Sequence, residues 1–317
     1  MKAAVVQAGG RTPVFADFDE PEPGPGEHII HVRAGALSQL TRARASGAHY
    51  SATGSFPLVP GVDGVGTLDD GRLVYFVLPR APFGAMAERT VVDERRMVTL
   101  PTGLDVIQTA AIANPGMSSW AALAERARMA PGETVLVNGA TGASGRLAVE
   151  VARLFGAARV IATGRNRAAL AELGADAVIP LTEDGDALEA AFRHQFALGV
   201  DVVLDYLWGA SAERLLVAAA KAGPEGRRLR FVQIGSVAGA EIRLPAAVLR
   251  SSAVEMMGSG LGSVPLPRLL AAVAGVFGAA ANGGFRLPAT PVPLADVERT
   301  WDAPDGGRIV FTIPDPA

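Results

Sequence analysis

The sequence predicts an α/β protein in which a β-rich domain precedes a doubly wound parallel sheet. Up to residue 113, short apolar runs are separated by clusters of glycine and proline, which is typical of strands joined by turns. After Asn114-Pro115, strand-like and helix-like segments alternate, which indicates a parallel sheet covered by helices. The length of 317 residues also exceeds what one hydrophobic core usually organises, so we expect two domains.

In the β-rich part, apolar runs are predicted to form strands over 3–7, 28–34, 72–78 and 89–92. The turn-rich stretch 19–28 is expected to be a loop, and the glycine-punctuated stretch 59–68 a strand region that bends. Near the end of the chain, residues 305–313 are predicted to form a strand, and the apolar run after Pro267 a helix. We therefore predict one domain from residues 1–113 together with 250–317.

Residues 114–249 are predicted to form the parallel-sheet domain. Its strands are expected over 133–139, 159–163, 176–181, 201–207 and 230–236. Its helices are expected over 118–129, 144–157, 165–175, 186–199 and 211–223. One more strand, over 253–260, is predicted beyond the boundary of this domain.

Composition excludes several classes of function. The net charge is −3 and no block of like charges occurs, so neither a nucleic-acid partner nor a membrane-surface role is expected. There is no cysteine, which excludes disulfides, thiolate zinc ligands and cysteine nucleophiles. The first residues lack the apolar run of a signal peptide, and the longest apolar run, 269–281, is too short to span a bilayer. We expect a cytoplasmic protein.

A glycine pattern at the first strand-to-helix junction predicts a nucleotide site. Ala140-x-Gly142-x-x-Gly145 follows an apolar strand and opens a helix, which is the dinucleotide fingerprint with alanine at its first position. The free N–H groups of the helix start are expected to bind phosphates, and the hydroxyls of Thr141 and Ser144 to add donors beside Ala143. The alternative is a glycine-rich turn without a ligand, but the position inside a run of strand–helix units favours a nucleotide.

Gly164-Arg165-Asn166-Arg167 stands where the second strand of this unit should end, and it contains no acid. Arg165 lies 20 residues after Gly145, where an NAD site carries Asp or Glu for the ribose 2′-hydroxyl. An arginine there binds a 2′-phosphate instead, so the sequence predicts NADP(H). Gly164 removes side-chain bulk and Asn166 adds a donor. The alternative is a pair of solvated arginines at a helix start, although cations there oppose the helix dipole.

The loop also resembles that of the short-chain dehydrogenases, but two observations oppose that family. Its loop lies near the N-terminus, whereas about 135 residues come first here, and it uses a tyrosine with lysine four residues later, which no tyrosine of this chain has. The order of motifs instead resembles the medium-chain dehydrogenase/reductase superfamily over nearly the whole chain. The segments that carry this resemblance are Pro23–Leu37, Val59–Gly66, Gly116–Leu123, Pro131–Gly145, Asp201–Gly209 and Gly306–Phe311. It implies a β-rich GroES-like catalytic domain, then a Rossmann domain, then a return to the catalytic domain.

Within that superfamily the chain resembles the zinc-free, quinone oxidoreductase-like branch. The zinc-dependent alcohol dehydrogenases use cysteine and a Gly-His-Glu motif, and this chain has no cysteine and only Glu27-His28 as a fragment of that motif. The resemblance implies NADPH-dependent hydride transfer to a small-molecule quinone or α,β-unsaturated carbonyl without a metal, in a homodimer. Two alternatives stay open: a non-catalytic NADPH-binding or redox-sensing protein, and an enoyl reductase acting on tethered chains.

The candidate catalytic residues come from a segment of the β-rich domain, 38–50. The branch often has Asn-Pro-x-Asp-x-x-x-Arg-x-Gly there, followed by a tyrosine. Alignment without gaps places Ser38 at the Asn position, Thr41 at the Asp position and Ala45 at the Arg position. Tyr50 falls one place late, with His49 in its usual slot. We expect Ser38 and Thr41 to line the pocket, and Tyr50 to bond the substrate carbonyl or donate a proton; the alternative for Tyr50 is an aromatic that shields the cleft.

Two further turns are predicted to contact the nicotinamide half of the cofactor, because ligands of open parallel sheets gather beyond the carboxyl ends of the strands. The residues expected there are Ile234, Gly235, Ser236, Gly258, Ser259 and Gly260. Asn114, at the junction before the Rossmann domain, is expected to contact either ligand. The alternative for both turns is simple turn chemistry.

Overall fold

The computed structural model describes residues 1–52, 55–303 and 307–314, which form two compact units. Unit 1 contains residues 1–114 and the chain from Val273 onward, and unit 2 contains Pro115–Ala272. Among the described residues, no helix is long and apolar enough to cross a bilayer.

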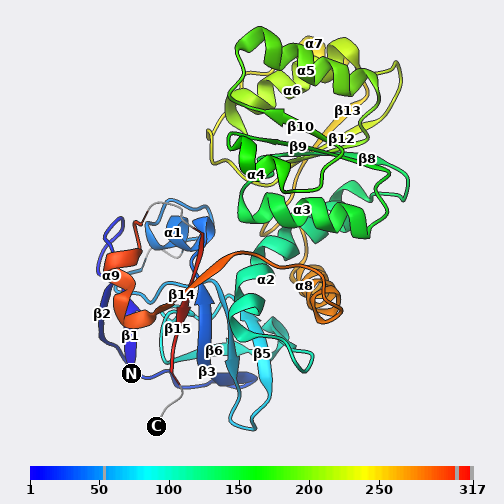
Figure 1. Ribbon diagram of the computed structural model, residues 1–317. Coiled ribbons are helices and arrows are strands. Elements are labelled where there is room, and N and C mark those ends of the chain that lie inside the picture. The colour runs from blue at the N-terminus through cyan, green and yellow to red at the C-terminus, as the bar shows by residue number, and fades with distance from the viewer. Residues whose placement is uncertain (53–54, 304–306, 315–317) are drawn as a thin grey trace. The chain divides into compact units, whose positions relative to one another are not determined.

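Unit 2 is built on a six-stranded sheet in which all strands run parallel (Figure 1). In spatial order the strands are β10 (Ala177–Pro180), β9 (Arg159–Gly164), β8 (Thr134–Asn138), β11 (Val202–Asp205), β12 (Leu229–Gln233) and β13 (Val254–Gly258). Sequence order reverses between β8 and β11, so this is the switch point at which ligands of doubly wound sheets bind.

Helices cover both faces of this sheet, as Figure 1 shows. On one side lie α3 (Ala143–Leu154) and α4 (Arg167–Ala171), and on the other α5 (Gly185–Ala197), α6 (Gly209–Ala222) and α7 (Ala246–Arg250). Phe192, Leu215 and Phe231 are fully or almost fully buried and form part of the core under the second group. The predicted doubly wound sheet is therefore present.

The second boundary of the parallel-sheet domain differs from the prediction. We expected this domain to end at residue 249, but β13 pairs with β12 along its whole length, Leu229 to Gln233 opposite Val254 to Gly258. Backbone pairing binds β13 to this sheet, so unit 2 extends to Ala272. The first boundary also falls inside a helix, because α2 (Val106–Ala121) continues through Pro115 and into a π-helical turn, η2 (Ala122–Ala127).

Unit 1 contains a mixed, mostly antiparallel sheet and a small two-stranded one. The larger sheet has the order β14 (Ala289–Pro293), β15 (Arg308–Thr312), β3 (Glu27–Ala36), β4 (Asp63–Thr67), β5 (Leu73–Val77) and β7 (Met97–Thr99), and β6 (Arg89–Asp93) also pairs with β3. The smaller sheet joins β1 (Lys2–Val5) to β2 (Val14–Asp17). Asp305 and Gly306 of the predicted last strand lie outside the described residues.

Short helices complete unit 1. They are α1 (Gln39–Ala45), η1 (Glu94–Arg96), η3 (Leu294–Asp296) and α9 (Val297–Thr300), and α8 (Leu266–Ala281) leads into this unit from unit 2. Helix α1 directly follows β3 (Figure 1), so the ten-residue strand fixes where the predicted catalytic segment begins.

Candidate functional site

The glycine loop of unit 2 leaves the start of α3 open to a ligand. Gly139 turns the chain after β8 with a φ of +90°, which favours glycine. Gly142 caps α3 without any side-chain hydrogen bond and is itself exposed. In the described part of the chain, the first N–H groups of this 12-residue helix therefore have no side-chain cap and are left for a ligand.

Gly145 and Gly164 are required for close packing around this loop. A Cβ atom on Gly145 would lie 2.3 Å from the Gly139 carbonyl oxygen, and one on Gly164 would lie 2.7 Å from Cγ2 of Thr141. In contrast, a Cβ atom on Gly142 would have its nearest neighbour at 3.7 Å. The loop thus packs tightly on its inner side and stays open on the side where a pyrophosphate would approach.

The positively charged segment at the end of β9 divides into three roles. Arg167 forms an ion pair with Glu183, and the Asn166 side chain caps α4 by accepting a hydrogen bond from the Ala169 amide at 3.0 Å. Arg165 is exposed and has no hydrogen bond or ion pair with any residue that the structure describes. Of the two predicted arginines, Arg165 is the one whose guanidinium remains available to a 2′-phosphate.

A buried polar network holds the ends of β8, β9 and β11 together. The Asn138 side chain donates to Asp205 Oδ1 at 2.8 Å and accepts from the Thr163 hydroxyl at 2.7 Å. Asp205 also accepts from the backbone amides of Leu207 and Trp208. Burial raises the pKa of Asp205, while its hydrogen bonds oppose that rise. The network fixes the strand ends between which the switch point lies.

A second connection, which the sequence did not predict, reaches the phosphate helix. The hydroxyls of Tyr206 and Ser119 are 2.8 Å apart, and the Ser119 hydroxyl lies 3.1 Å from the Ser144 carbonyl oxygen in the first turn of α3. Burial raises the pKa of Tyr206, so its hydroxyl stays protonated. Because Ser119 and Tyr206 are 87 residues apart and occur in apolar segments, no local pattern signals this contact.

The turn after β12 makes internal hydrogen bonds with most of its amides. Ile234 and Gly235 both donate from their backbone to the Asp205 carbonyl, at 2.8 and 3.1 Å. A Cβ atom on Gly235 would lie 2.6 Å from the Tyr206 carbonyl oxygen, so glycine is needed for packing. The Ser236 hydroxyl has no partner among the described residues, so it is available to a ligand.

The turn after β13 is held in a similar way. The Ser259 amide donates to the Gln233 carbonyl at 2.8 Å, and the Gly260 amide donates to the Ser263 hydroxyl at 2.8 Å. The Arg126 guanidinium donates to the Gly258 carbonyl at 2.7 Å. Much of the turn chemistry that we considered as the alternative is therefore present, and a role in nicotinamide binding stays a prediction. Asn114 is half-buried at the last position of unit 1.

In unit 1, the structure brings Ser38 and Thr41 together. Ser38 caps α1, and its Oγ accepts from the Thr41 amide at 3.0 Å and lies 2.9 Å from the Thr41 hydroxyl. Both side chains are buried. Tyr50 is 74% exposed and its ring stacks on His49, with ring centroids 4.1 Å apart. Burial, followed by the nearby charge of Arg44, lowers the pKa of His49.

A cavity of about 410 Å³ lies against the Thr41 side of α1. It is lined by Thr41, Arg44 and Ala45, by residues 58–62 and 78–83, and by Glu27, Asp93 and Arg96. This volume falls in the range of small-molecule sites. Ser38 and Tyr50 are not among the lining residues, so Thr41 is the predicted catalytic residue that the structure places at a cavity. Among the described residues, no group of three or more His, Asp or Glu side chains would suit a metal.

A buried cluster of ionisable groups includes a residue that directly follows one of the cavity-lining residues in the sequence. Asp63 follows the lining residue Val62, and its carboxylate accepts from the Tyr75 hydroxyl at 3.1 Å. Its other oxygen, Oδ1, has no partner among the described residues, and neither do Nε and Nη2 of Arg308. Burial raises the pKa of Asp63 to about 6, although Arg308 and Tyr75 both lower it.

The raised pKa of Asp63 leads us to expect that the free energy of unfolding falls as the pH rises. The folded-state pKa of Asp63, about 6, exceeds its unfolded value of 3.8, so its contribution is fully present below about pH 4 and lost as the pH rises through about 6. The free energy of unfolding of the wild type, relative to Asp63→Asn, should fall by about 3 kcal/mol over that range. Urea unfolding of both proteins at closely spaced pH values measures this difference, and parallel curves would contradict it.

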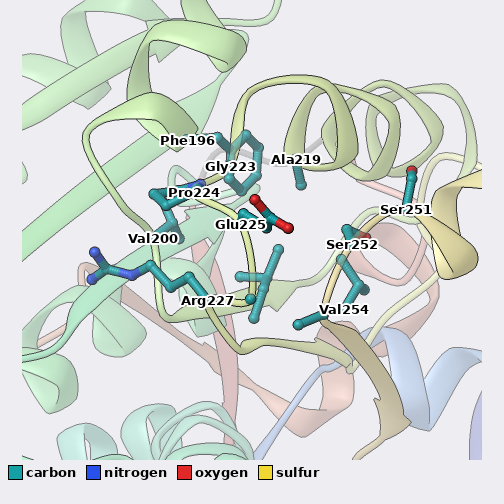
Figure 2. Close-up of a pocket in the computed structure, with 13 residues that line it drawn as sticks. Phe196, Val200, Ala219, Gly223, Pro224, Glu225, Arg227, Ser251, Ser252 and Val254 are labelled. Atoms are coloured by element: carbon teal, nitrogen blue, oxygen red, sulfur yellow. The ribbon is translucent and has the colours of Figure 1, made fainter.

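A second cavity, shown in Figure 2, is not a nucleotide site. It measures about 40 Å³, which holds only a few water molecules. Its lining includes Leu229 and Val254, the first residues of β12 and β13, so it lies at the amino ends of the parallel strands, away from the phosphate loop. Arg227 points away from the centre in Figure 2 and is bound to Asp201.

The chain is similar to known proteins over most of its length. A family model described as zinc-binding dehydrogenase matches residues 143–274. A probable NADPH-dependent quinone reductase, tdiC, of Emericella nidulans is 31% identical and aligns with 98% of this chain and 99% of its own length. The quinone oxidoreductase of Thermus thermophilus, whose crystal structures include a complex with NADPH, is 30% identical, with a TM-score of 0.76 over 99% of this chain and all of that one.

Part of the chain also resembles a segment of much larger enzymes. A mycocerosic acid synthase-like polyketide synthase of Mycobacterium tuberculosis is 31% identical over 234 residues, which covers 70% of this chain but only 10% of the synthase.

Proposed function

Because this chain belongs to the medium-chain dehydrogenase/reductase superfamily, in its quinone oxidoreductase-like branch, we propose that it is an oxidoreductase that uses NADPH to reduce a quinone or an α,β-unsaturated carbonyl compound. The observation that supports this choice of cofactor is Arg165, which follows β9 beside the open phosphate loop. Its guanidinium has no partner among the described residues. A 2′-phosphate attracts this cation, and no carboxylate stands at that position to favour NADH.

The residues of unit 2 fit the cofactor. The N–H groups at the start of α3 would bind the pyrophosphate, Arg165 the 2′-phosphate, and the Ser236 hydroxyl the nicotinamide half. When bound, NADPH supplies a hydride. The chain's own task is then to orient the acceptor, to stabilise the oxyanion that hydride addition creates, and to let a proton reach it.

The Thr41 hydroxyl is the candidate to stabilise that oxyanion. If the Ser38 hydroxyl donates to Thr41 Oγ1, the Thr41 proton is free to donate to a carbonyl oxygen in the cavity that Thr41 lines. Tyr50 stays a proposed proton donor, and its exposure means that it would exchange protons directly with water. We propose that no metal takes part and that the protein is a homodimer, as the resemblance implies.

Steady-state kinetics test this function. We expect the consumption of NADPH to depend on an added quinone or enone, to persist after treatment with a metal chelator, and to be at least about tenfold more efficient than with NADH. NADPH binding without turnover across a broad panel of acceptors would instead support the non-catalytic alternative, and turnover lost with the chelator would contradict the metal-free mechanism.

A further inference from the structure

The cavity of unit 1 carries positive charge that its acids do not neutralise. Three arginines and two acids line it. The Glu27 carboxylate already has two partners, because its Oε1 lies 3.4 Å from Arg80 Nε and its Oε2 accepts a hydrogen bond from the Gly24 amide. Asp93 is bound by both the amide and the guanidinium of Arg95, which is not a lining residue.

Arg44 and Arg96 donate hydrogen bonds to neutral groups, although the charge of Arg96 also helps to lower the pKa of Asp93, the carboxylate that Arg95 binds. Arg44 donates to the Ser51 hydroxyl at 3.1 Å, and Arg96 donates to the Leu78 carbonyl at 2.7 Å. Within the part of the chain that the structure describes, no carboxylate lies within ion-pair distance of either guanidinium. Arg44 is half-buried, and burial lowers its pKa, which reflects the cost of a cation without a counter-charge. An anion in the cavity would offset that cost.

The cavity also lies where this chain departs from the segment typical of its branch. Thr41 stands at the Asp position and Ala45 at the Arg position of that segment, and both line the cavity. Threonine in place of aspartate removes a negative charge and alanine in place of arginine removes a positive one, so the net charge is unchanged, and the smaller side chains leave space. The two departures thus give the cavity room, next to the arginines Arg44 and Arg96 that also line it.

We propose that this cavity binds a carboxylate or phosphate group of the substrate, with Arg44 and Arg96 supplying the positive charge, while the Thr41 hydroxyl serves the carbonyl oxygen. This inference rests on the proposed function, since it assigns the class of acceptor: an anionic enone or quinone rather than a neutral one. Arginine suits either oxyanion because its planar fork matches both.

Matched acceptors test the proposal. One pair is an enone carboxylic acid and its methyl ester, and a second is an enone phosphate ester and the parent alcohol, so the two pairs distinguish the oxyanions. The wild type should prefer the anionic member of at least one pair by about tenfold or more in kcat/KM. Arg44→Gln and Arg96→Gln should each reduce this preference several-fold, through a raised KM for the anionic member.

Two further variants provide controls. Arg72→Gln removes an exposed arginine that pairs with Asp70 outside the cavity, and it should keep the wild-type preference. Arg44→Lys keeps the positive charge and should retain part of the preference for the anionic acceptor that Arg44→Gln loses. This comparison separates loss of charge from a local folding defect.

The outcomes are distinguishable from failure of the proposed function. Equal use of both members of each pair by the wild type, or unchanged preference in both glutamine variants, would overturn the anion site while neutral acceptors are still reduced. If no acceptor is reduced at all, titration calorimetry with the enone acid as the probe decides the matter. Binding that Arg44→Gln weakens would support the site, and no binding to the wild type would overturn it.

Discussion

Replacing Arg165 with alanine is expected to weaken NADPH binding by about 10- to 100-fold and to leave NADH binding nearly unchanged. Hydrogen bonds to charged groups typically contribute about 1.5–3 kcal/mol, and about 1.4 kcal/mol corresponds to one factor of ten in affinity. The guanidinium has no other partner among the described residues, so its removal should cost the folded protein almost nothing. The loss should therefore appear in nucleotide binding and not in the free energy of unfolding.

Arg167→Ala is the matched control for this variant. Both arginines belong to the same four-residue segment, but Arg167 is held by Glu183. Its removal should lower NADPH affinity much less, unless the cofactor displaces Glu183. Dissociation constants of both nucleotides, measured at one fixed ionic strength because salt screens these contacts, provide the comparison. Equal weakening of NADPH and NADH by Arg165→Ala would refute a 2′-phosphate site.

The sequence predicted the phosphate loop and Arg165 because both depend on local rules. A strand, a glycine pattern and a helix follow one another directly, and the spacing from Gly145 to Arg165 is set by one helix and one strand. The sequence could not show that Glu183 forms an ion pair with Arg167, because this contact joins the segment after β9 to the segment after β10. Local spacing thus located the segment, and only the fold could show which arginine is available.

The same distinction explains the domain boundary. The strand over Val254–Gly258 was predicted as an element, but which sheet it joins depends on its pairing with β12. An edge strand of five residues carries no local signal for its partner, because any exposed strand edge offers the same N–H and C=O groups.

The catalytic segment shows the largest gap between sequence and structure. Alignment placed Ser38, Thr41 and Tyr50 in one segment, yet only Thr41 lines the cavity, because Ser38 caps α1 and Tyr50 is exposed. The arginines that give the cavity its charge, Arg44 and Arg96, are 52 positions apart and follow no motif. A site assembled from distant loops of one domain depends on tertiary packing, which spacing along the chain does not encode.

Gly142→Ala and Gly145→Ala are expected to impair different properties, nucleotide binding in the first and both stability and binding in the second. At Gly145 the new Cβ would lie 2.3 Å from a backbone oxygen, so the start of α3 must move away from the loop after β8. We expect a loss of about 1–3 kcal/mol in the free energy of unfolding, as overpacking usually causes, together with weak NADPH binding. Gly142 has a φ of −77° and open space around its Cβ position. The free energy of unfolding of Gly142→Ala should therefore lie within about 1 kcal/mol of the wild-type value.

Gly142→Ala should nevertheless raise the dissociation constant of NADPH by about tenfold or more, because the added methyl group stands where the pyrophosphate must approach the backbone. The two variants thus separate the two reasons for glycine in this loop: packing of helix on strand at Gly145, and access of the ligand at Gly142. Denaturant unfolding and nucleotide titration on the same preparations measure both quantities. Wild-type NADPH affinity in Gly142→Ala would show that the phosphates do not bind at the start of α3, and the nucleotide site would then have to be sought elsewhere along the carboxyl edge of the sheet.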